Sequence, residues 1–526
     1  MQGSMTNRQN NFYFLSALLL IVVCTIVRVL YARSFLLTPD ETNYWQWSRH
    51  MAWGYHDQTP MIAWAIRLAT FFCGPTALAV RLPSILSMAI ASFYLVMMAD
   101  HWFSSRVALQ TAILTQSVFI FNVGALLATA DGLQGAAWAA ACYHTARGYQ
   151  EHQWRHWILG GIWFGFGMLS KYTMVLFLPC VYVFGLLIPF CRRRLWTLKP
   201  YIGCLLGLVF FMPVLFWNAA HHWNSFRHVA YLGGANTGIS LHWKYLAEYI
   251  GSQIGLLTPM VFGLIFAGWI RVARQWRTSG EWIYAYLFFT SFPMFAAFAV
   301  LSLHTRVYGN WPCAGYLTAC LLAAAFWSTT PANSTDSQRS VKSRRLWRWT
   351  WGSALCLTAL ILIHVQIPIL PIPPQKDRTI YELQGWDRLG RRVAEVQKQM
   401  PQPEKCFIFG VRYQVASELA FYMPGQPFTV SINRWHRPNV YDYWWQDQDL
   451  IGKDAVGVTR DIKSRDRLSE VFEHVDAPEP FPIYASGTKP DMGQPPVRTF
   501  YIYRCFGFKG GLRWVPRRPG DIRAGS

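Results

Sequence analysis

The chain has 526 residues, of which 53% are hydrophobic and only 14% are charged, against about a quarter in soluble proteins. This balance excludes an ordinary soluble protein. The net charge of +21 therefore indicates the basic cytoplasmic loops of a membrane protein, not nucleic-acid binding. The eleven cysteines form no Cys-x-x-Cys pair and no Cys/His cluster with zinc spacing, so they predict no metal site.

Apolar stretches of about 20 residues predict membrane spans. About eleven occur, at 12–31, 77–99, 107–122, 131–146, 157–170, 172–190, 201–217, 246–270, 282–301, 311–328 and 349–369. Cytoplasmic loops collect Lys and Arg, and alternate loops on one side carry Arg106, Arg147, Arg192, Arg271 and Lys342. We therefore expect a cytoplasmic N-terminus. The loop after the first span, and everything after residue 369, face outward, toward the periplasm in a bacterium.

The first outward loop places two adjacent carboxylates, Asp40 and Glu41, at the exit of a membrane span. A third acid, Asp57, follows a run of aromatic residues. Ionisable groups at a membrane boundary are costly and usually mark chemistry or a pathway. Two amphipathic pieces, near 41–51 and 61–72, predict helices that lie in the membrane interface within residues 32–76. We expect this loop to carry the chemistry.

Each of these acids also has an ordinary structural explanation. Thr38-Pro39-Asp40-Glu41 is a common helix start, where acids are favoured in the first turn. Asp57 could bind a substrate or sit in a polar turn, and both interpretations stay open.

A run of prolines between 368 and 374 marks a boundary, and the sequence predicts a transmembrane domain over 1–369 and a soluble domain over 370–526. In the second part, helical spacing covers 379–400 and 414–422, and strands are predicted at 405–411, 427–432 and 498–506. This order indicates a small α/β domain. Cys406 and Cys505 lie on predicted strands; they could pair in an oxidising compartment or stay as buried thiols.

Several motifs share the outward side of this topology. They are Asp40-Glu41, Gly54-Tyr55-His56-Asp57-x-x-Pro60, Arg81-Leu82-Pro83-Ser84, TADGLQ (129–134), LSKYT (169–173), NAAHHWNSF (218–226) and GNWP (309–312). In this order they resemble the GT-C fold glycosyltransferases, specifically the protein-mannosyltransferase and ArnT-like superfamily that uses polyprenyl-phosphate sugars. The resemblance covers nearly the whole chain. Asp57-Gln58-Thr59-Pro60 departs from the Asp-His-Pro-Pro of bacterial relatives, so a histidine role there is absent or passes to His56.

The resemblance implies an inverting transfer in which Asp40 is the base, with Glu41 supporting it and Asp57 in the same loop. It places Asp131 at the rim of the active site, and His56, His222 and Asn310 are further candidates for substrate contact. Asp131 could instead cap its helix.

A polyprenyl-phosphate leaving group needs cations placed in advance. Lys171, Arg306 and Arg28 are candidates on the outward side. Lys171 could also extend to the membrane surface, and Arg28 could pair with an acid inside the bundle. We expect no metal, because His221 and His222 lack a carboxylate cluster, although some GT-C enzymes use a divalent ion.

The sequence thus predicts a multi-pass enzyme of a bacterial inner membrane. It would move a sugar from a polyprenyl (undecaprenyl) phosphate donor to a lipid, glycan or protein acceptor at the periplasmic face, with no nucleic-acid partner. It has no P-loop and no Rossmann fingerprint, as expected for an enzyme with a pre-activated lipid donor. One alternative is a transporter or flippase of lipid-linked saccharides, which predicts charges near the bilayer midplane, inverted repeats and broken helices. Another is an envelope scaffold.

Overall fold

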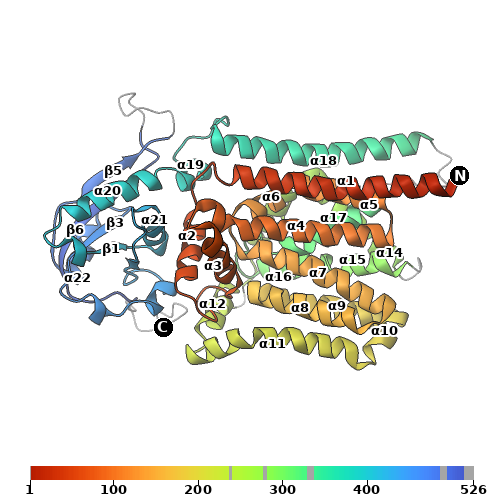
Figure 1. Ribbon diagram of the computed structural model, residues 1–526, viewed down its shortest axis with the longest axis horizontal. Coiled ribbons are helices and arrows are strands. Elements are labelled where there is room, and N and C mark those ends of the chain that lie inside the picture. The colour runs from red at the N-terminus through yellow and green to blue at the C-terminus, as the bar shows by residue number, and fades with distance from the viewer. Residues whose placement is uncertain are drawn as a thin grey trace.

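The computed structural model describes residues 2–235, 238, 240–276, 281–328, 337–485 and 495–514. A long helical bundle forms one end of the molecule and a sheet covered by helices forms the other (Figure 1). The bundle comprises α1 (Gln2–Tyr31), α4 (Ala77–Trp102), α5 (Ser105–Ser117), α6 (Phe119–Leu126), α7 (Ala130–Glu151), α8 (Trp154–Ser170), η1 (Tyr172–Leu176), α9 (Phe177–Leu187), α10 (Pro189–Leu195), α11 (Leu198–Ala220), α13 (Trp243–Leu257), α14 (Pro259–Gln275), α15 (Trp282–Phe289), α16 (Phe292–Ser302), α17 (Cys313–Trp327) and α18 (Ser337–Gln366).

Fewer helices than expected are long and apolar enough to cross a membrane. Among the described residues there are five, or up to eight if each bent pair of helices counts as one span. The five are Arg8–Tyr31, Ala77–Trp102, Leu198–Ala220, Trp282–Ser302 and Lys342–Gln366. These helices indicate a multi-pass membrane protein, but the expected count of about eleven is not confirmed.

Bends and short helices explain the difference. The predicted spans 107–122, 172–190 and 246–270 each correspond to two helices that meet at 68°, 117° and 109° respectively. The predicted spans near 157–170 and 311–328 correspond to α8 and α17, with 17 and 15 residues. Helix α7 carries buried polar residues such as Gln134 and His144. Apolar composition finds these segments but does not reveal where they bend.

Three short helices lie between the bundle and the sheet (Figure 1): α2 (Pro39–Arg49), α3 (Met61–Cys73) and α12 (Asn224–Leu232). The first two are the helices expected within 32–76. Helix α2 begins as its sequence predicts, with Thr38 as N-cap and Pro39 at the first helical position. Trp45 and Trp47 of α2 share a buried apolar cluster with Ala416 and Phe421, which joins this layer to the C-terminal part of the chain.

The C-terminal residues form a six-stranded sheet with helices on both faces. Its elements are α19 (Arg378–Leu383), α20 (Trp386–Lys398), η2 (Pro403–Lys405), β1 (Phe407–Gly410), α21 (Tyr413–Tyr422), β2 (Thr429–Ser431), η3 (Val440–Tyr443), η4 (Asp447–Asp449), β3 (Ala455–Thr459), α22 (Ser464–Val471), β4 (Phe472–Val475), β5 (Glu479–Ile483) and β6 (Arg498–Phe508). The strand order is β2-β1-β3-β6-β4, with β5 also paired to β6.

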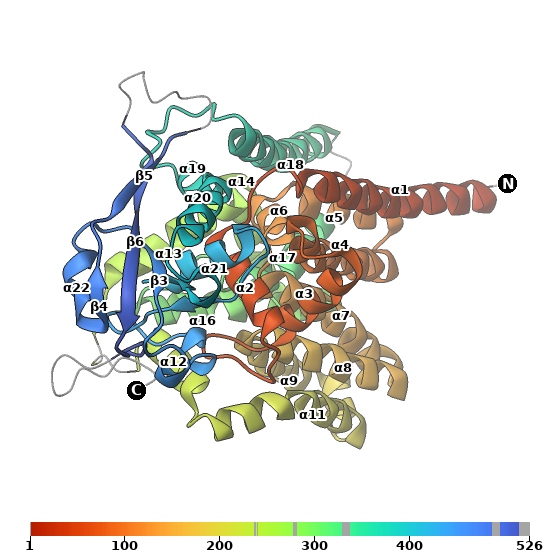
Figure 2. The ribbon, with the colours of Figure 1, turned by 60° about the vertical axis from the view of Figure 1, so that its left-hand side comes forward.

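Both β2 and β3 run parallel to β1, whereas β6 is antiparallel to its neighbours. Helices α20 and α21 cover one face of the sheet and α22 covers the other (Figure 2). The three predicted strands and the helix at 414–422 are confirmed. The helix expected over 379–400 is interrupted, because Gly385 adopts a positive φ of 83° between α19 and α20.

Cys406 and Cys505 are both buried free thiols. Residue 407 pairs with Ala455 of β3, and Ala455 pairs in turn with Cys505 of β6, so a whole strand separates the two cysteines. Two strand spacings amount to about 10 Å, which exceeds the Cα separation that a disulfide tolerates. Of the two alternatives left open by the sequence, the structure supports buried thiols.

We therefore expect both thiols to be labelled by an alkylating reagent when the full-length protein is denatured without reductant. Labelling of the native protein should be slow, because both side chains are buried. Peptide mass spectrometry measures both. A disulfide-linked peptide containing Cys406 and Cys505 would contradict the sheet register.

Candidate functional site

Asp40 occupies the first turn of α2 and is exposed to solvent. It makes no hydrogen bond or ion pair with any residue that the structure describes. Neighbouring protein atoms limit the hydration of the carboxylate and raise its pKa, and the charges of Glu382, Asp57 and Glu41 raise it further. Arg378 offsets part of this shift. An accessible, unpartnered acid with a raised pKa is suited to accept a proton.

Glu41 has a different environment, although it is the next residue. Its side chain is fully buried and forms two hydrogen-bonded contacts with the Arg81 guanidinium, Nε to Oε1 at 2.8 Å and Nη2 to Oε2 at 2.9 Å. It also accepts hydrogen bonds from the backbone N–H groups of Thr38 (2.8 Å) and Ala128 (3.0 Å). Arg81 donates its remaining hydrogen bonds to the carbonyls of Ala32, Phe35 and Leu36.

This ion pair ties together the end of α1, the start of α2, the first turn of α4 and the loop before α7. A carboxylate with so many protein partners is not free to contact a substrate in this conformation. We infer that Glu41 positions Asp40, in place of the closer catalytic role expected from the sequence.

Three of the predicted site residues come together beside the bundle. Lys171, at the end of α8, forms an ion pair with Asp131 of α7, Nζ to Oδ1 at 2.6 Å. Asn310 donates a hydrogen bond from Nδ2 to the other oxygen of Asp131 at 3.0 Å. Asp131 is therefore neither a lone binding residue nor the helix cap, which is Thr129. Lys171 pairs with it and does not extend alone to the membrane surface.

An apolar cavity of about 260 Å³ opens directly beneath this polar cluster. Asp131 and Asn310 form part of its wall, and the rest is mostly apolar. Its apolar lining includes Met88, Ile120, Phe121, Leu127, Leu256 and Leu317. The lining residues come from α4, α6, α7, α13 and α17, so the bent helices of the bundle enclose it. The combination of a charged mouth and an apolar interior suits a ligand with one polar and one hydrocarbon end.

A second polar cluster surrounds Asp57, in the loop between α2 and α3. The Arg437 guanidinium donates from Nη1 to Asp57 Oδ1 at 2.6 Å, and His228 Nε2 lies 3.2 Å from the same oxygen. Burial alone would raise the pKa of Asp57, but Arg437, His56 and His228 together lower it to about 2. Asp57 is therefore ionised at neutral pH and held in an ion pair. A simple polar turn, one of the two interpretations that the sequence left open, does not account for this ion pair.

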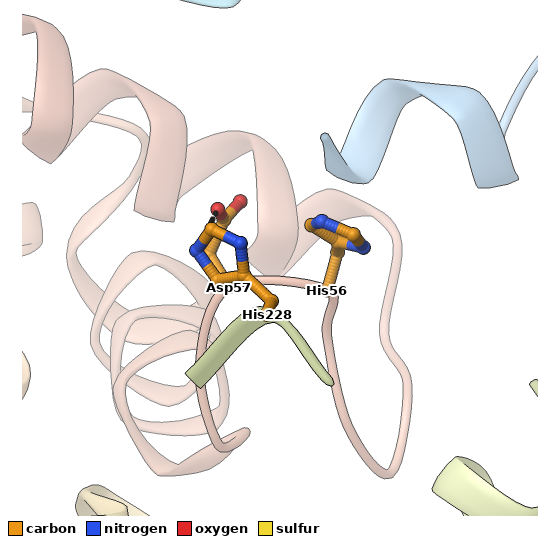
Figure 3. Close-up of side chains that lie close together, drawn as sticks. All are labelled: His56, Asp57 and His228. Carbon is orange, nitrogen blue, oxygen red and sulfur yellow. Dashed lines mark ion pairs between the residues drawn. The ribbon is translucent and has the colours of Figure 1, made fainter. Parts of the chain in front are cut away.

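His56 is buried beside this ion pair. Its Nδ1 lies 3.2 Å from the Tyr443 hydroxyl, while its Nε2 has no hydrogen-bond partner. Burial lowers its pKa to about 4, so the ring is neutral at physiological pH. The His56 and His228 rings face each other at a centroid distance of 5.0 Å (Figure 3).

His56, Asp57 and His228 could together hold a metal ion, since one ligand atom from each lies within 4.8 Å of the others (Figure 3). Two imidazoles and one carboxylate form a donor set that suits Zn²⁺ and similar ions. Sequence reasoning points only to His221 and His222 as possible metal ligands, so it does not predict this group of three residues. The Asp57 oxygen, however, is already bound by Arg437.

The acids of these clusters lie around one tyrosine. Burial raises the pKa of the Tyr44 phenol, and the carboxylates of Asp40, Asp131 and Asp57 raise it further. Tyr44 lies one turn along α2 from Asp40. The acids predicted as site residues in the first outward loop and in α7 therefore share one region.

Three other predicted residues lie elsewhere. Arg28 is buried inside the bundle and donates from Nη2 to Asn122 Oδ1 at 2.8 Å. This position differs from the expected phosphate contact, and the partner is an amide in place of the acid of the alternative interpretation. Arg306 is 78% exposed and pairs with Glu248 of α13 at 3.2 Å. His222 is exposed, with a positive φ of 54°, so the histidine that reaches the site from this loop is His228, six residues later.

Sequence reasoning did not identify Arg437 or Tyr443. Both belong to the C-terminal part of the chain, far from the loop that carries Asp57. The contact from Arg437 to Asp57 joins residues 380 positions apart, which no local pattern reveals. The sequence could have indicated His228, because it is the third histidine of residues 218–245, after His221 and His222.

Comparisons with known proteins agree with this architecture. Residues 57–217 match the family described as dolichyl-phosphate-mannose-protein mannosyltransferase. A lipid A galacturonosyltransferase, RgtD of Rhizobium johnstonii, is 25% identical over 328 residues. That match covers 59% of this chain and 64% of the length of the relative.

Among solved structures, ArnT of Cupriavidus metallidurans bound to undecaprenyl phosphate superimposes with a TM-score of 0.62 at 15% identity, covering 92% of this chain and 97% of ArnT. The oligosaccharyltransferase AglB of Archaeoglobus fulgidus, with an inhibitory peptide and a dolichol-phosphate, gives a TM-score of 0.51 at 12% identity. It covers 85% of this chain and 69% of AglB.

The chain therefore shares the fold of ArnT, and over residues 57–217 it is similar to the mannosyltransferase family. Both similarities agree with the GT-C, ArnT-like resemblance of its motifs.

The Glu41–Arg81 ion pair generates a stability prediction. Glu41→Met or Arg81→Met alone should destabilise the folded protein by about 3–5 kcal/mol, because each leaves one buried charge without its partner. The double variant should be less destabilised than the sum of the two. Thermal unfolding of the detergent-purified protein measures this.

Arg67→Met, on the exposed face of α3, is the matched control and should leave the melting temperature unchanged. Simple additivity of the two single variants would contradict a direct coupling between Glu41 and Arg81.

Proposed function

We propose that the protein is a membrane glycosyltransferase that moves a sugar from polyprenyl (undecaprenyl) phosphate to an acceptor at the outer face of a bacterial inner membrane. The observation that carries this proposal is the position of an unpartnered acid, Asp40, in the same region as the Asp131–Lys171–Asn310 cluster above an apolar cavity. The acid supplies a base. The cluster and cavity supply a place for a charged group attached to a hydrocarbon chain.

In the proposed reaction, an acceptor hydroxyl or amine attacks the anomeric carbon of the donor sugar. Asp40 takes the proton from the attacking group, and the bond between the anomeric carbon and the phosphate oxygen breaks. Polyprenyl phosphate leaves with the bonding electron pair. The resemblance to ArnT-like enzymes implies inversion at the anomeric carbon.

Lys171 is the cation best suited to receive the developing negative charge of the phosphate. Its ammonium group is already fixed by Asp131, so it needs no reorganisation when the donor arrives. Asn310 holds the other oxygen of Asp131 and contributes a donor at the cavity mouth. The prenyl chain would occupy the apolar cavity, with its first isoprene units against α6 and α17.

The relatives support lipid-linked sugar transfer in particular. One is named for galacturonosyl transfer to lipid A, and the ArnT structure was solved with undecaprenyl phosphate bound. We therefore propose lipid A, or another glycan or lipid of the envelope, as the acceptor class. This implies that Asp40 and the sheet domain of residues 370–526 face the periplasm.

A transporter or flippase is the less favoured function. It would require charged groups near the middle of the spans. In the described part of the chain, the clusters around Asp40, Asp57 and Asp131 instead lie next to the layer of short helices below the sheet.

Asp40→Asn tests the catalytic base. The amide keeps the shape of the side chain but cannot accept the proton, so turnover should fall by about 10²–10⁴-fold while donor binding is retained. Sugar transfer from a polyprenyl-phosphate donor by the reconstituted full-length protein measures turnover. Mass spectrometry of envelope lipids and glycans, with and without the gene, identifies the sugar and acceptor.

Asp466→Asn, on the exposed surface of α22, is the matched control and should transfer at the wild-type rate. Unchanged turnover in Asp40→Asn would remove Asp40 from the mechanism.

The raised pKa of Asp40 predicts the pH dependence. The carboxylate must be ionised to act as a base, so kcat/KM should rise with pH through a pKa above the ordinary aspartate value and then level off. Glu382→Gln removes a nearby negative charge and should move this limb to lower pH. Arg378→Ala removes a nearby positive charge and should move it to higher pH. A limb that stays fixed in both variants would belong to another group.

A further inference from the structure

Arg437 reaches the candidate site from the opposite end of the chain. It lies between β2 and η3, in the C-terminal part, and its Nη1 donates to Asp57 Oδ1 at 2.6 Å. The Arg437 side chain is 41% exposed, whereas that of Asp57 is 18% exposed. The guanidinium therefore covers the carboxylate, while part of it remains open to solvent.

The same carboxylate belongs to the candidate metal-binding group of His56, Asp57 and His228. A divalent ion bound by this group would need a lone pair from the Asp57 carboxylate, whose Oδ1 already lies 2.6 Å from Arg437 Nη1 and 3.2 Å from His228 Nε2. It would also bring two positive charges beside a guanidinium that is always protonated. A divalent ion and the Arg437 guanidinium would thus compete for the Asp57 carboxylate.

Other contacts of the segment around Arg437 fix it in this place. The Arg437 guanidinium lies 5.7 Å from the centre of the Tyr413 ring, on α21. Tyr443, six residues after Arg437, is within 3.2 Å of His56 Nδ1 and accepts a hydrogen bond from Asn224 at 3.0 Å. The segment 437–443 therefore contacts both the loop that carries Asp57 and the start of α12, which carries His228.

We propose that Arg437 is the resident cation of this site: its guanidinium takes the place of a divalent ion at His56, Asp57 and His228. It holds Asp57 and its loop in position beside Asp40. This inference rests on the proposed transferase function for its effect on turnover. Arg437 is a positioning residue, because it acts through Asp57.

One consequence is that the wild-type site should not take up a metal ion. A second is that removal of the guanidinium should uncover the three ligands. Arg437→Ala is therefore expected to bind one Zn²⁺ per chain, and the double variant Arg437→Ala/His228→Ala should not bind it. Arg437→Lys should keep the site closed to metal, because the ammonium retains the charge.

The experiment uses full-length protein purified in detergent and titrated with Zn²⁺ against a chromogenic chelator. Arg434→Ala is the matched control, since Arg434 lies three residues earlier and pairs with Glu470 on the surface at 3.5 Å. Thermal unfolding of each variant confirms that it is folded. If Arg437→Ala does not fold, Arg437→Gln, which keeps most of the side-chain volume, replaces it.

Zn²⁺ binding by the wild-type protein that His228→Ala abolishes would overturn the proposal. A folded Arg437→Ala protein that binds no Zn²⁺ would overturn it as well. These readouts do not depend on sugar transfer, so they stand apart from a failure of the proposed function. In the transfer assay, EDTA should leave wild-type turnover unchanged, Arg437→Ala should lower it about 10–100-fold, and Arg437→Lys should restore part of it.

Discussion

The ion pair between Glu41 and Arg81 is the constraint on which the site depends. Both side chains are completely buried, and a buried charge is tolerated only when its partner and hydrogen bonds are all in place. Successive residues of a helix point about 100° apart. Once Glu41 is held toward Arg81, the preceding residue points in another direction, and Asp40 is exposed. Of the two adjacent acids, Glu41 is therefore held inside the structure and Asp40 is left accessible for the role that we propose.

The remainder of the site follows a similar division between polar and apolar surroundings. Asp131 and Lys171 neutralise each other, and Asn310 donates a hydrogen bond to Asp131, at the mouth of a cavity whose interior is apolar. The bends between α5 and α6 and between α13 and α14 bring short helix ends, in place of continuous helices, to this cavity. A straight bundle would fill the same volume with side chains.

Local patterns predicted much of this structure correctly. The start of α2 follows from Thr38 and Pro39, and the strands β1, β2 and β6 follow from their apolar runs. Hydropathy alone located the apolar segments but did not reveal that some of them bend or, like α17, form short helices, so the expected number of spans is not confirmed. The sequence placed Asp131 and Lys171 in the site but did not predict their ion pair, since pairing depends on how α7 and α8 pack. Arg28 illustrates the opposite error: its position at the outer end of a span suggested the interface, but its side chain turns inward to Asn122.

The contact between Asp57 and Arg437 spans most of the chain, and this has a consequence for biosynthesis. A ribosome delivers Asp57 early and Arg437 only after more than three quarters of the protein has been made. Domains generally fold as the chain emerges, N-terminal parts first. The loop with Asp57 therefore spends the period of membrane insertion without its cation. It acquires its final geometry only when the C-terminal part of the chain has been made and has folded.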